Sequence, residues 1–101
     1  MRKIRLFCAA GMSTSLLVTK MQKAAEEIGY ECDIEANSVS EVSSKGPEAD
    51  IVLLGPQVKY ELKHVQEQLP GQKVEVIDMM DYGMANGMKI IKHVKEVLGD
   101  E

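Results

Sequence analysis

Residues 51–56 have the sequence Ile51-Val52-Leu53-Leu54-Gly55-Pro56. Four consecutive apolar side chains put apolar groups on both faces of a strand, which is typical of the centre of a parallel sheet covered by helices on both sides. The glycine and proline that follow predict a turn into a helix. This stretch therefore predicts an α/β fold with a buried parallel strand at its centre.

Three further segments predict strands of the same sheet. Residues 4–8 and 74–77 are short, mostly apolar segments, and residues 30–36 alternate between apolar and acidic side chains. Strict alternation indicates a strand with one exposed face, here at an edge of the sheet. Helical patterns separate the four strands. We therefore predict one α/β domain over residues 1–101, with a four-stranded parallel sheet and helices on both faces.

A helix is predicted after each strand. The first covers residues 14–28 and ends at Gly29, because glycine is favoured just past a helix C-terminus. A short helix at residues 38–44 and a longer one from Pro56 to Pro70 follow. The last helix is expected to be capped by Asp81 and to place five apolar residues on its inner face: Met84, Met88, Ile91, Val94 and Leu98.

Composition and charge argue against several classes of function. The 101 residues are 45% hydrophobic and 28% charged, and the formal net charge of −4 with no basic cluster disfavours binding to nucleic acid or anionic membranes. No apolar run approaches the ~20 residues of a membrane span, so we expect a cytoplasmic protein. Cys8 and Cys32 are expected to be free thiols, and neither a metal nor a cofactor is expected.

The candidate site begins where the first strand ends, in the stretch Phe7-Cys8-Ala9-Ala10-Gly11-Met12-Ser13-Thr14-Ser15. Amides at a helix N-terminus bind phosphate and favour a thiolate over a thiol. Cys8 is therefore predicted to be a nucleophile, although a free cysteine is often a small buried apolar residue, as expected for Cys32. One of the hydroxyls in this stretch would serve equally as a helix cap. The predicted phosphate-binding residues are Ala9, Ala10, Gly11, Met12, Ser13, Thr14 and Ser15.

Two other loops are expected at the same edge, because ligands of open parallel sheets bind beyond the carboxyl ends of the strands. The possible rim of the site consists of Pro56, Gln57, Tyr82 and Gly83, which follow the third and fourth strands. Gln57 could instead open a helix, and Tyr82 could cover its neighbour. Both histidines, His64 and His93, are expected to be solvent-facing helix residues.

The stretch that starts at Cys8 has the outline of a cysteine phosphatase loop, Cys-x5-Arg, but Thr14 takes the place of the arginine. An arginine would bind two phosphate oxygens and stabilise the transferring group. Without it we expect slow hydrolysis, which suits a phosphoryl carrier. The alternatives are a cysteine-based phosphatase or arsenate reductase on the same scaffold, a phosphoacceptor of the response-regulator type, and a binding module with a structural Cys8.

Three blocks of sequence carry a resemblance to a known family: LFCAAGMSTSLLV at residues 6–18, VLLGPQV at 52–58, and VID and DYG within 76–83. With them the chain resembles the IIB component of the bacterial phosphoenolpyruvate-dependent sugar phosphotransferase system, in the lactose/cellobiose (chitobiose) family. The resemblance covers essentially the whole length. It implies a parallel sheet in the order 2-1-3-4, similar to low-molecular-weight tyrosine phosphatases.

The resemblance also implies a transferase activity centred on Cys8. This residue would take a phosphoryl group from a phosphohistidine of a IIA protein and pass it to a disaccharide of the cellobiose, chitobiose or lactose type. Transfer would accompany uptake of the sugar through the membrane component IIC, which would bring the protein transiently to the inner face of the membrane.

Four methionines cluster in the sequence near the fourth strand: Met79, Met80, Met84 and Met88. Methionine is an adaptable apolar residue that fills irregular gaps in cores and also serves at binding surfaces. Most of these side chains are expected to pack the last helix, and a partner interface is the alternative.

Overall fold

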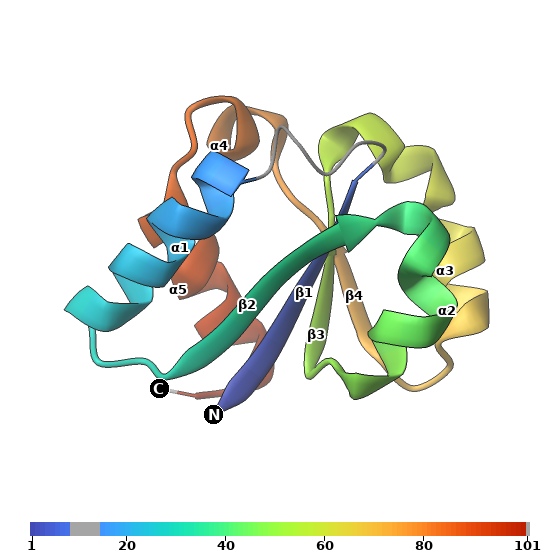
Figure 1. Cartoon of the computed structure of the whole chain (residues 1–101), viewed down its shortest axis with the longest axis horizontal. Coiled ribbons are helices and arrows are strands. Elements are labelled where there is room, and N and C mark those ends of the chain that lie inside the picture. Colours follow the sequence, from blue (N-terminus) through green and yellow to red (C-terminus); the bar gives the residue numbers. More distant parts are fainter. Residues whose placement is uncertain (9–14, 101) are drawn as a thin grey trace.

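The computed structural model describes residues 1–8 and 15–100. Within them, four parallel strands form one sheet in the order β2-β1-β3-β4 (Figure 1). The strands are β1 Arg2–Cys8, β2 Cys32–Ser38, β3 Ile51–Leu54 and β4 Lys73–Val76. The predicted fold class and strand order are confirmed, and the alternating strand lies at an edge as expected.

Helices cover both faces of this sheet, as Figure 1 shows. The helices α1 (Ser15–Glu27) and α5 (Gly87–Leu98) pack on one face, and α2 (Val42–Lys45) and α3 (Leu62–Gln68) pack on the other. A short helix, α4 (Met79–Gly83), precedes α5. Short 3-10 helices occur at η2 Val39–Glu41, η3 Gly46–Glu48 and η4 Pro56–Glu61. In the described part of the chain, no helix has the length and apolar character needed to span a membrane.

Two hydrophobic cores lie on opposite faces of the sheet. Ile4 and Leu6 of β1 pack with Met21 and Ile91 under α1 and α5, and all four side chains are fully buried. Burial of each such side chain stabilises the fold by about 1.5–3 kcal/mol. Phe7 belongs to the other core, because alternate residues of a strand face opposite sides. The apolar run of β3 supplies both cores, as predicted: Ile51 and Leu53 the first, Val52 and Leu54 the second.

The segment after β4 forms two helices rather than the predicted single helix capped by Asp81. Asp78 caps α4 instead, because its carboxylate accepts hydrogen bonds from the amides of Met80 at 3.1 Å and Asp81 at 3.3 Å. Asn86 caps α5 by accepting a bond of 3.2 Å from an amide three residues later. Ala85, with a φ of 51°, separates the two helices. The predicted cap was wrong because alanine rarely adopts this left-handed conformation and so did not suggest a break.

The break between α4 and α5 also changes which side chains face the core. Ile91 and Val94 are buried, and Met88 and Leu98 pack partly against the first core, as predicted. Met84 is 71% exposed, so its predicted place on the inner face was wrong. It is the C-cap residue of α4, where the helical period of α5 has not yet begun.

Other predicted helices are present with altered starts. The helix expected at residues 38–44 is η2 followed by α2, and the helix expected after Pro56 is η4 followed by α3. The first helix is followed by Gly29 with a φ of 68°, which agrees with its predicted role as a terminator. Both predicted helices are therefore present, and each begins with 3-10 turns, which are wound more tightly than α-helical turns.

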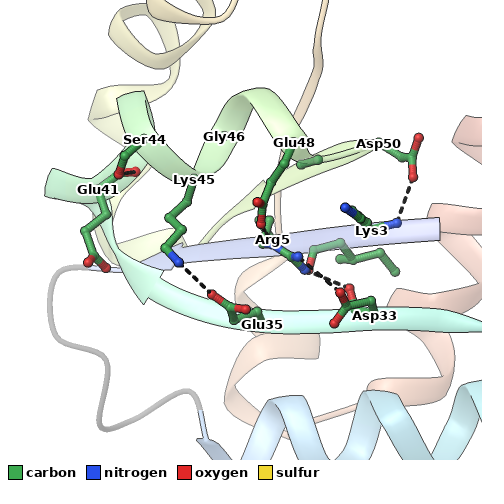
Figure 2. A network of polar contacts seen from close by, with 12 residues as sticks. Lys3, Arg5, Asp33, Glu35, Glu41, Ser44, Lys45, Gly46, Glu48 and Asp50 are labelled. Atoms are coloured by element: carbon green, nitrogen blue, oxygen red, sulfur yellow. Dashed lines mark hydrogen bonds and ion pairs between the residues drawn. The ribbon is translucent and has the colours of Figure 1, made fainter. Parts of the chain in front are cut away.

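A buried guanidinium ties the edge strand to the middle of the sheet, a feature that sequence analysis missed. Arg5 on β1 is 3% exposed. Its Nε donates a hydrogen bond to Glu48 at 2.7 Å, and its other nitrogens donate to the backbone carbonyl and the carboxylate of Asp33 at 2.9 and 3.2 Å. Figure 2 shows these partners on both sides of Arg5, with the Lys45–Glu35 pair nearby. The network joins β1 to β2 and to η3.

Candidate active site

Cys8 is the last residue of β1, at the carboxyl end of a central strand. It is 3% exposed, and it shares a strand face with Ile4 and Leu6 because side chains repeat every second residue. Its place therefore agrees with the rule that ligands of open parallel sheets bind beyond the carboxyl ends of strands. Of the predicted phosphate-binding residues, Ser15 is the exposed first residue of α1. The others, Ala9, Ala10, Gly11, Met12, Ser13 and Thr14, lie outside the described residues.

Tyr82 contacts the sulfur from a different element. Its hydroxyl Oη lies 3.8 Å from the Cys8 Sγ, within the range of a hydrogen bond to sulfur. Tyr82 belongs to α4, which begins at the Asp78 cap directly after β4. This single side-chain contact therefore joins the carboxyl end of β1 to the segment that follows the carboxyl end of β4. The predicted rim position of Tyr82 corresponds to this contact with Cys8.

Gly55 provides the space that the sulfur occupies. A Cβ atom at this residue would lie 2.7 Å from the Cys8 Sγ, 3.0 Å from the Gln57 Oε1 and 3.5 Å from the Tyr82 Cε2. Three side chains thus converge on the position that a side chain at Gly55 would take. The Gly55 amide also donates a hydrogen bond of 3.0 Å to the carbonyl of Phe7, which fixes the two loop starts together.

The surroundings of Cys8 favour the protonated thiol. Burial raises the pKa of Cys8 above its ordinary value, and hydrogen bonds from the Tyr82 hydroxyl and the Gly55 backbone oppose that rise. The net direction is upward, so these residues do not supply the preference for a thiolate expected from the sequence. That expectation rested on the amides of residues 9–14, which lie outside the described residues.

The remaining rim residues have different positions. Pro56 is buried at the start of η4. Gly83 is exposed at the end of α4, and nothing lies within 4 Å of the place that its Cβ would take. The structure therefore places the Tyr82 hydroxyl at the sulfur and the Gln57 side-chain oxygen beside Gly55.

Ser38 lies beside Cys8 in the sheet, because the parallel register pairs these two residues across β1 and β2. Its Oγ lies 3.0 Å from the Oγ of Ser40 and accepts a hydrogen bond from the Ser40 amide. Sequence analysis assigned Ser38 to a helix and did not place it at this edge. The strand register, which no local pattern reveals, is what brings it there.

The second thiol lies at the opposite end of the sheet. Cys32 begins β2 and pairs with Arg2, so it is at the amino end of its strand. It is half-buried, as a packing residue of the first core. Burial, assisted by the Asp100 carboxylate, raises the pKa of Cys32 to about 11. Cys32 is therefore a poor nucleophile at neutral pH.

Both histidines are exposed, and so are three of the four methionines that follow the fourth strand. His64 and His93 lie on the surface of α3 and α5, as predicted, and the Nε2 of His93 is 3.1 Å from the Oε1 of Glu75. Met79, Met80 and Met84 are 66%, 70% and 71% exposed, so the expectation that most of the methionines pack the last helix was wrong. We call these three side chains the α4 methionine surface: two lie on α4, the helix that carries Tyr82, and Met84 is its C-cap residue.

Comparison with known sequences identifies relatives over nearly the whole chain. The family described as "PTS system, Lactose/Cellobiose specific IIB subunit" matches residues 3–93. The chain is 47% identical over 91 residues to the oligo-beta-mannoside-specific EIIB component of Bacillus subtilis, with 88% of each chain covered. It is 42% and 41% identical over 102 residues to the galactose-specific and cellobiose-specific EIIB components of two Lactococcus lactis subspecies, with 94% of each chain covered.

Comparison with solved structures finds the same fold. The cellobiose-specific IIB component of Borrelia burgdorferi is 34% identical, with a TM-score of 0.81 and coverage of 98% of this chain and 93% of that one. The lactose-specific IIB domain of Streptococcus pneumoniae has a TM-score of 0.79 at 19% identity, and covers 94% of this chain and 95% of its own. The second likeness shows the fold alone.

Proposed function

The chain belongs to the lactose/cellobiose-specific IIB family of the phosphoenolpyruvate-dependent sugar phosphotransferase system, and from this premise we propose that Cys8 is its phosphoryl carrier. Cys8 accepts a phosphoryl group from a phosphohistidine of a IIA protein. It passes the group to a disaccharide of the cellobiose, chitobiose or lactose type during uptake through IIC. This cycle makes the protein a protein-phosphocysteine–sugar phosphotransferase.

Two displacement steps make up the proposed cycle. In the first, Cys8 gives up its thiol proton, and a lone pair of the resulting thiolate attacks phosphorus. The N–P bond of the donor breaks with its electron pair returning to the imidazole, which takes up a proton. In the second, a sugar hydroxyl oxygen attacks phosphorus, the S–P bond breaks, and sulfur leaves as a thiolate. The hydroxyl proton is released on the acceptor side. The thiolate takes up a proton, and Cys8 returns to its starting state.

The position of Cys8 is the observation that supports this proposal best. Its sulfur lies at the carboxyl end of β1, beside Gly55 and 3.8 Å from the Tyr82 hydroxyl. The other thiol, Cys32, lies at the amino end of β2 with a raised pKa. We further propose that amides from Ala9 to Ser15 hold the phosphoryl oxygens. Pro56, Gln57, Tyr82 and Gly83 would frame the rim.

A IIA donor would have to approach a sulfur that is almost fully buried. Tyr82 faces that sulfur from α4, and the α4 methionine surface is exposed on the same short helix and at its C-cap. Exposed apolar side chains grouped on one element are typical of protein contacts, and methionine adapts to partners of different shape. We assign this surface to contact with the phosphohistidine donor.

The identity of the sugar is assigned to the IIC partner. The relatives, at 41% to 47% identity, are named for oligo-beta-mannoside, galactose and cellobiose. Proteins of comparable similarity to this chain thus carry the names of three different sugars. This pattern supports a shared phosphoryl carrier whose sugar is selected by another component.

Intact mass spectrometry after incubation with phosphoenolpyruvate, the general phosphotransferase proteins and a cognate IIA tests the proposal. Wild type and Cys32→Ser are expected to gain one phosphate, and Cys8→Ser none. If an active relay leaves all three unphosphorylated, the carrier proposal is wrong. The lifetime of the phosphorylated protein without a sugar acceptor separates a carrier from a phosphatase, because a phosphatase would release inorganic phosphate quickly.

A further inference from the structure

We propose that Tyr82 is a second catalytic residue, whose hydroxyl donates a hydrogen bond to the Cys8 thiolate and stabilises the sulfur both as nucleophile and as leaving group. This inference rests on the proposed function of Cys8. It gives a specific role to a residue that the sequence placed only on the rim of the site.

The contact between the two side chains is the first support. The Tyr82 Oη lies 3.8 Å from the Cys8 Sγ. Hydrogen bonds of catalytic groups are commonly long before the reaction partner binds and shorten in the reacting complex. The Tyr82 ring also packs beside Gly55, where its Cε2 would be 3.5 Å from an added Cβ. Because Gly55 has no side chain, nothing from this residue separates the Tyr82 hydroxyl from the sulfur.

The backbone of α4 holds this tyrosine in place. The Tyr82 amide donates to the carbonyl of Asp78 at 2.9 Å, and the Asp78 carboxylate caps the start of the helix. Beyond Tyr82, the amide of Ala85 donates to the Tyr82 carbonyl at 3.1 Å. The Asp81 carboxylate lies 3.5 Å from Lys89 Nζ on α5. These contacts, with partial burial of the ring in the first core, fix the ring rather than leaving it free to swing.

The electrostatic surroundings show why the sulfur needs such a donor. Burial raises the pKa of Cys8, and the Tyr82 hydroxyl is the larger of the two hydrogen-bonding groups that oppose this rise. His64 and His93 lie exposed on other helices, so neither contacts this thiol. A tyrosine hydroxyl carries one O–H donor, which can point at a thiolate.

The proton of Tyr82 stays on its oxygen throughout the proposed cycle. When the thiolate attacks, sulfur supplies the electron pair of the new S–P bond and the hydrogen bond to sulfur weakens. When the sugar takes the phosphoryl group, the S–P electron pair returns to sulfur. The Tyr82 O–H then stabilises the thiolate as it re-forms. Hydrogen bonds of this charge-assisted kind are stronger than neutral ones.

The ionisation of Cys8 provides a direct test, because it can be followed without any partner protein. The Cβ resonance of Cys8 in protein labelled with 13C at the cysteine Cβ would be titrated in wild type, Tyr82→Phe and Tyr60→Phe. Tyr60 is 75% exposed on η4, so the same chemical change there is the matched control. We expect the pKa of Cys8 to rise by about one unit in Tyr82→Phe, because one hydrogen bond to a charged group is lost. A Tyr82→Phe curve that overlays the wild-type curve, or an equal shift in Tyr60→Phe, overturns the proposal.

The rate of phosphorylation by IIA over a range of pH is the second readout. At pH values below the Cys8 pKa of both proteins, Tyr82→Phe should be phosphorylated about tenfold more slowly than wild type. The difference should close as the pH rises and Cys8 becomes ionised in both proteins. A deficit of constant size at every pH would mean that Tyr82 acts only by supporting the fold, and would also overturn the proposal. If wild type accepts no phosphate, the proposed function fails, while the Cβ titration still decides the role of Tyr82.

Discussion

The Cys8 sulfur fills the space in which Gly55 would otherwise carry a side chain: an added Cβ would lie 2.7 Å from Sγ. Real Cβ atoms essentially never come closer than 3.0 Å to a neighbouring heavy atom, so the two positions exclude each other. β1 and β3 are hydrogen-bonded neighbours, and the Gly55 amide is bonded to the Phe7 carbonyl at 3.0 Å. The backbone therefore cannot move away easily. Glycine is required here by the sulfur rather than by a special φ angle.

Gly55→Ala is expected to displace the sulfur and slow phosphorylation of Cys8 by about 10- to 100-fold, because small misplacements of a reacting atom are costly. Overpacking should also lower the free energy of unfolding by about 1–3 kcal/mol. Gly46→Ala is the matched control, since its Cβ would crowd Leu69 at 2.6 Å in the second core. The control should be destabilised and yet retain its phosphorylation rate. Equal rates in the two variants would show that the position of the sulfur is not limiting.

Removal of the buried Arg5 should destabilise the fold. Arg5→Ala would lose the bonds to Glu48 and Asp33 and leave a cavity, so we expect the free energy of unfolding to fall by about 2–4 kcal/mol. Arg5→Met should cost less, because methionine refills the space and both carboxylates are partly exposed to water. Urea unfolding of wild type, Arg5→Ala and Arg5→Met measures the order of their free energies of unfolding. A loss in Arg5→Met as large as in Arg5→Ala would mean that the ion pairs, not packing, dominate.

Acid should weaken the contact between the two ends of the chain. Hydrogen bonds from Arg2 at 2.6 Å, and then from Tyr30, hold the pKa of Asp100 at about 2, below its ordinary 3.8. A carboxyl with a lowered folded-state pKa stabilises the fold above its unfolded pKa, and this stabilisation is lost as pH falls through the folded value. Wild type should therefore lose the contribution between about pH 4 and pH 2.

Thermal unfolding of wild type and Asp100→Asn over this pH range tests whether the Asp100 carboxylate stabilises the fold at neutral pH and loses this effect in acid. The melting temperature of the variant should be lower near neutral pH, and the two should converge as the pH approaches 2. A difference that stays constant down to the lowest pH would show that the carboxylate charge is not responsible.

Local patterns were sufficient to predict the sheet and the position of Cys8. The run at residues 51–54 is apolar on both faces because β3 lies between β1 and β4, with one hydrophobic core on each face of the sheet. The alternation at residues 30–36 reflects an edge strand with Ile34 buried and charged side chains on the other face. Each pattern records the environment of its own strand, so one sequence was enough.

Features that depend on distant partners were not predictable in this way. Arg5 interrupts an apolar run, and its partners Asp33 and Glu48 are 28 and 43 residues away in the sequence. The contact of Tyr82 with Cys8 spans 74 residues. The sequence and the family resemblance placed Tyr82 at the edge, but the contact depends on the short α4 helix and the left-handed Ala85. No hydrophobic period signals that break.

The α4 methionine surface leads to a last prediction, which separates packing from docking. Because Met79, Met80 and Met84 are largely exposed, their replacement by glutamine should change the free energy of unfolding by less than about 0.5 kcal/mol each. The concentration of IIA needed for half-maximal phosphorylation of Cys8 should rise several-fold, because apolar contacts with the donor are lost. His64→Gln on α3 is the control and should change neither quantity. A large loss of stability in the triple variant would mean that these side chains pack the protein, and an unchanged requirement for IIA would place the donor on another surface.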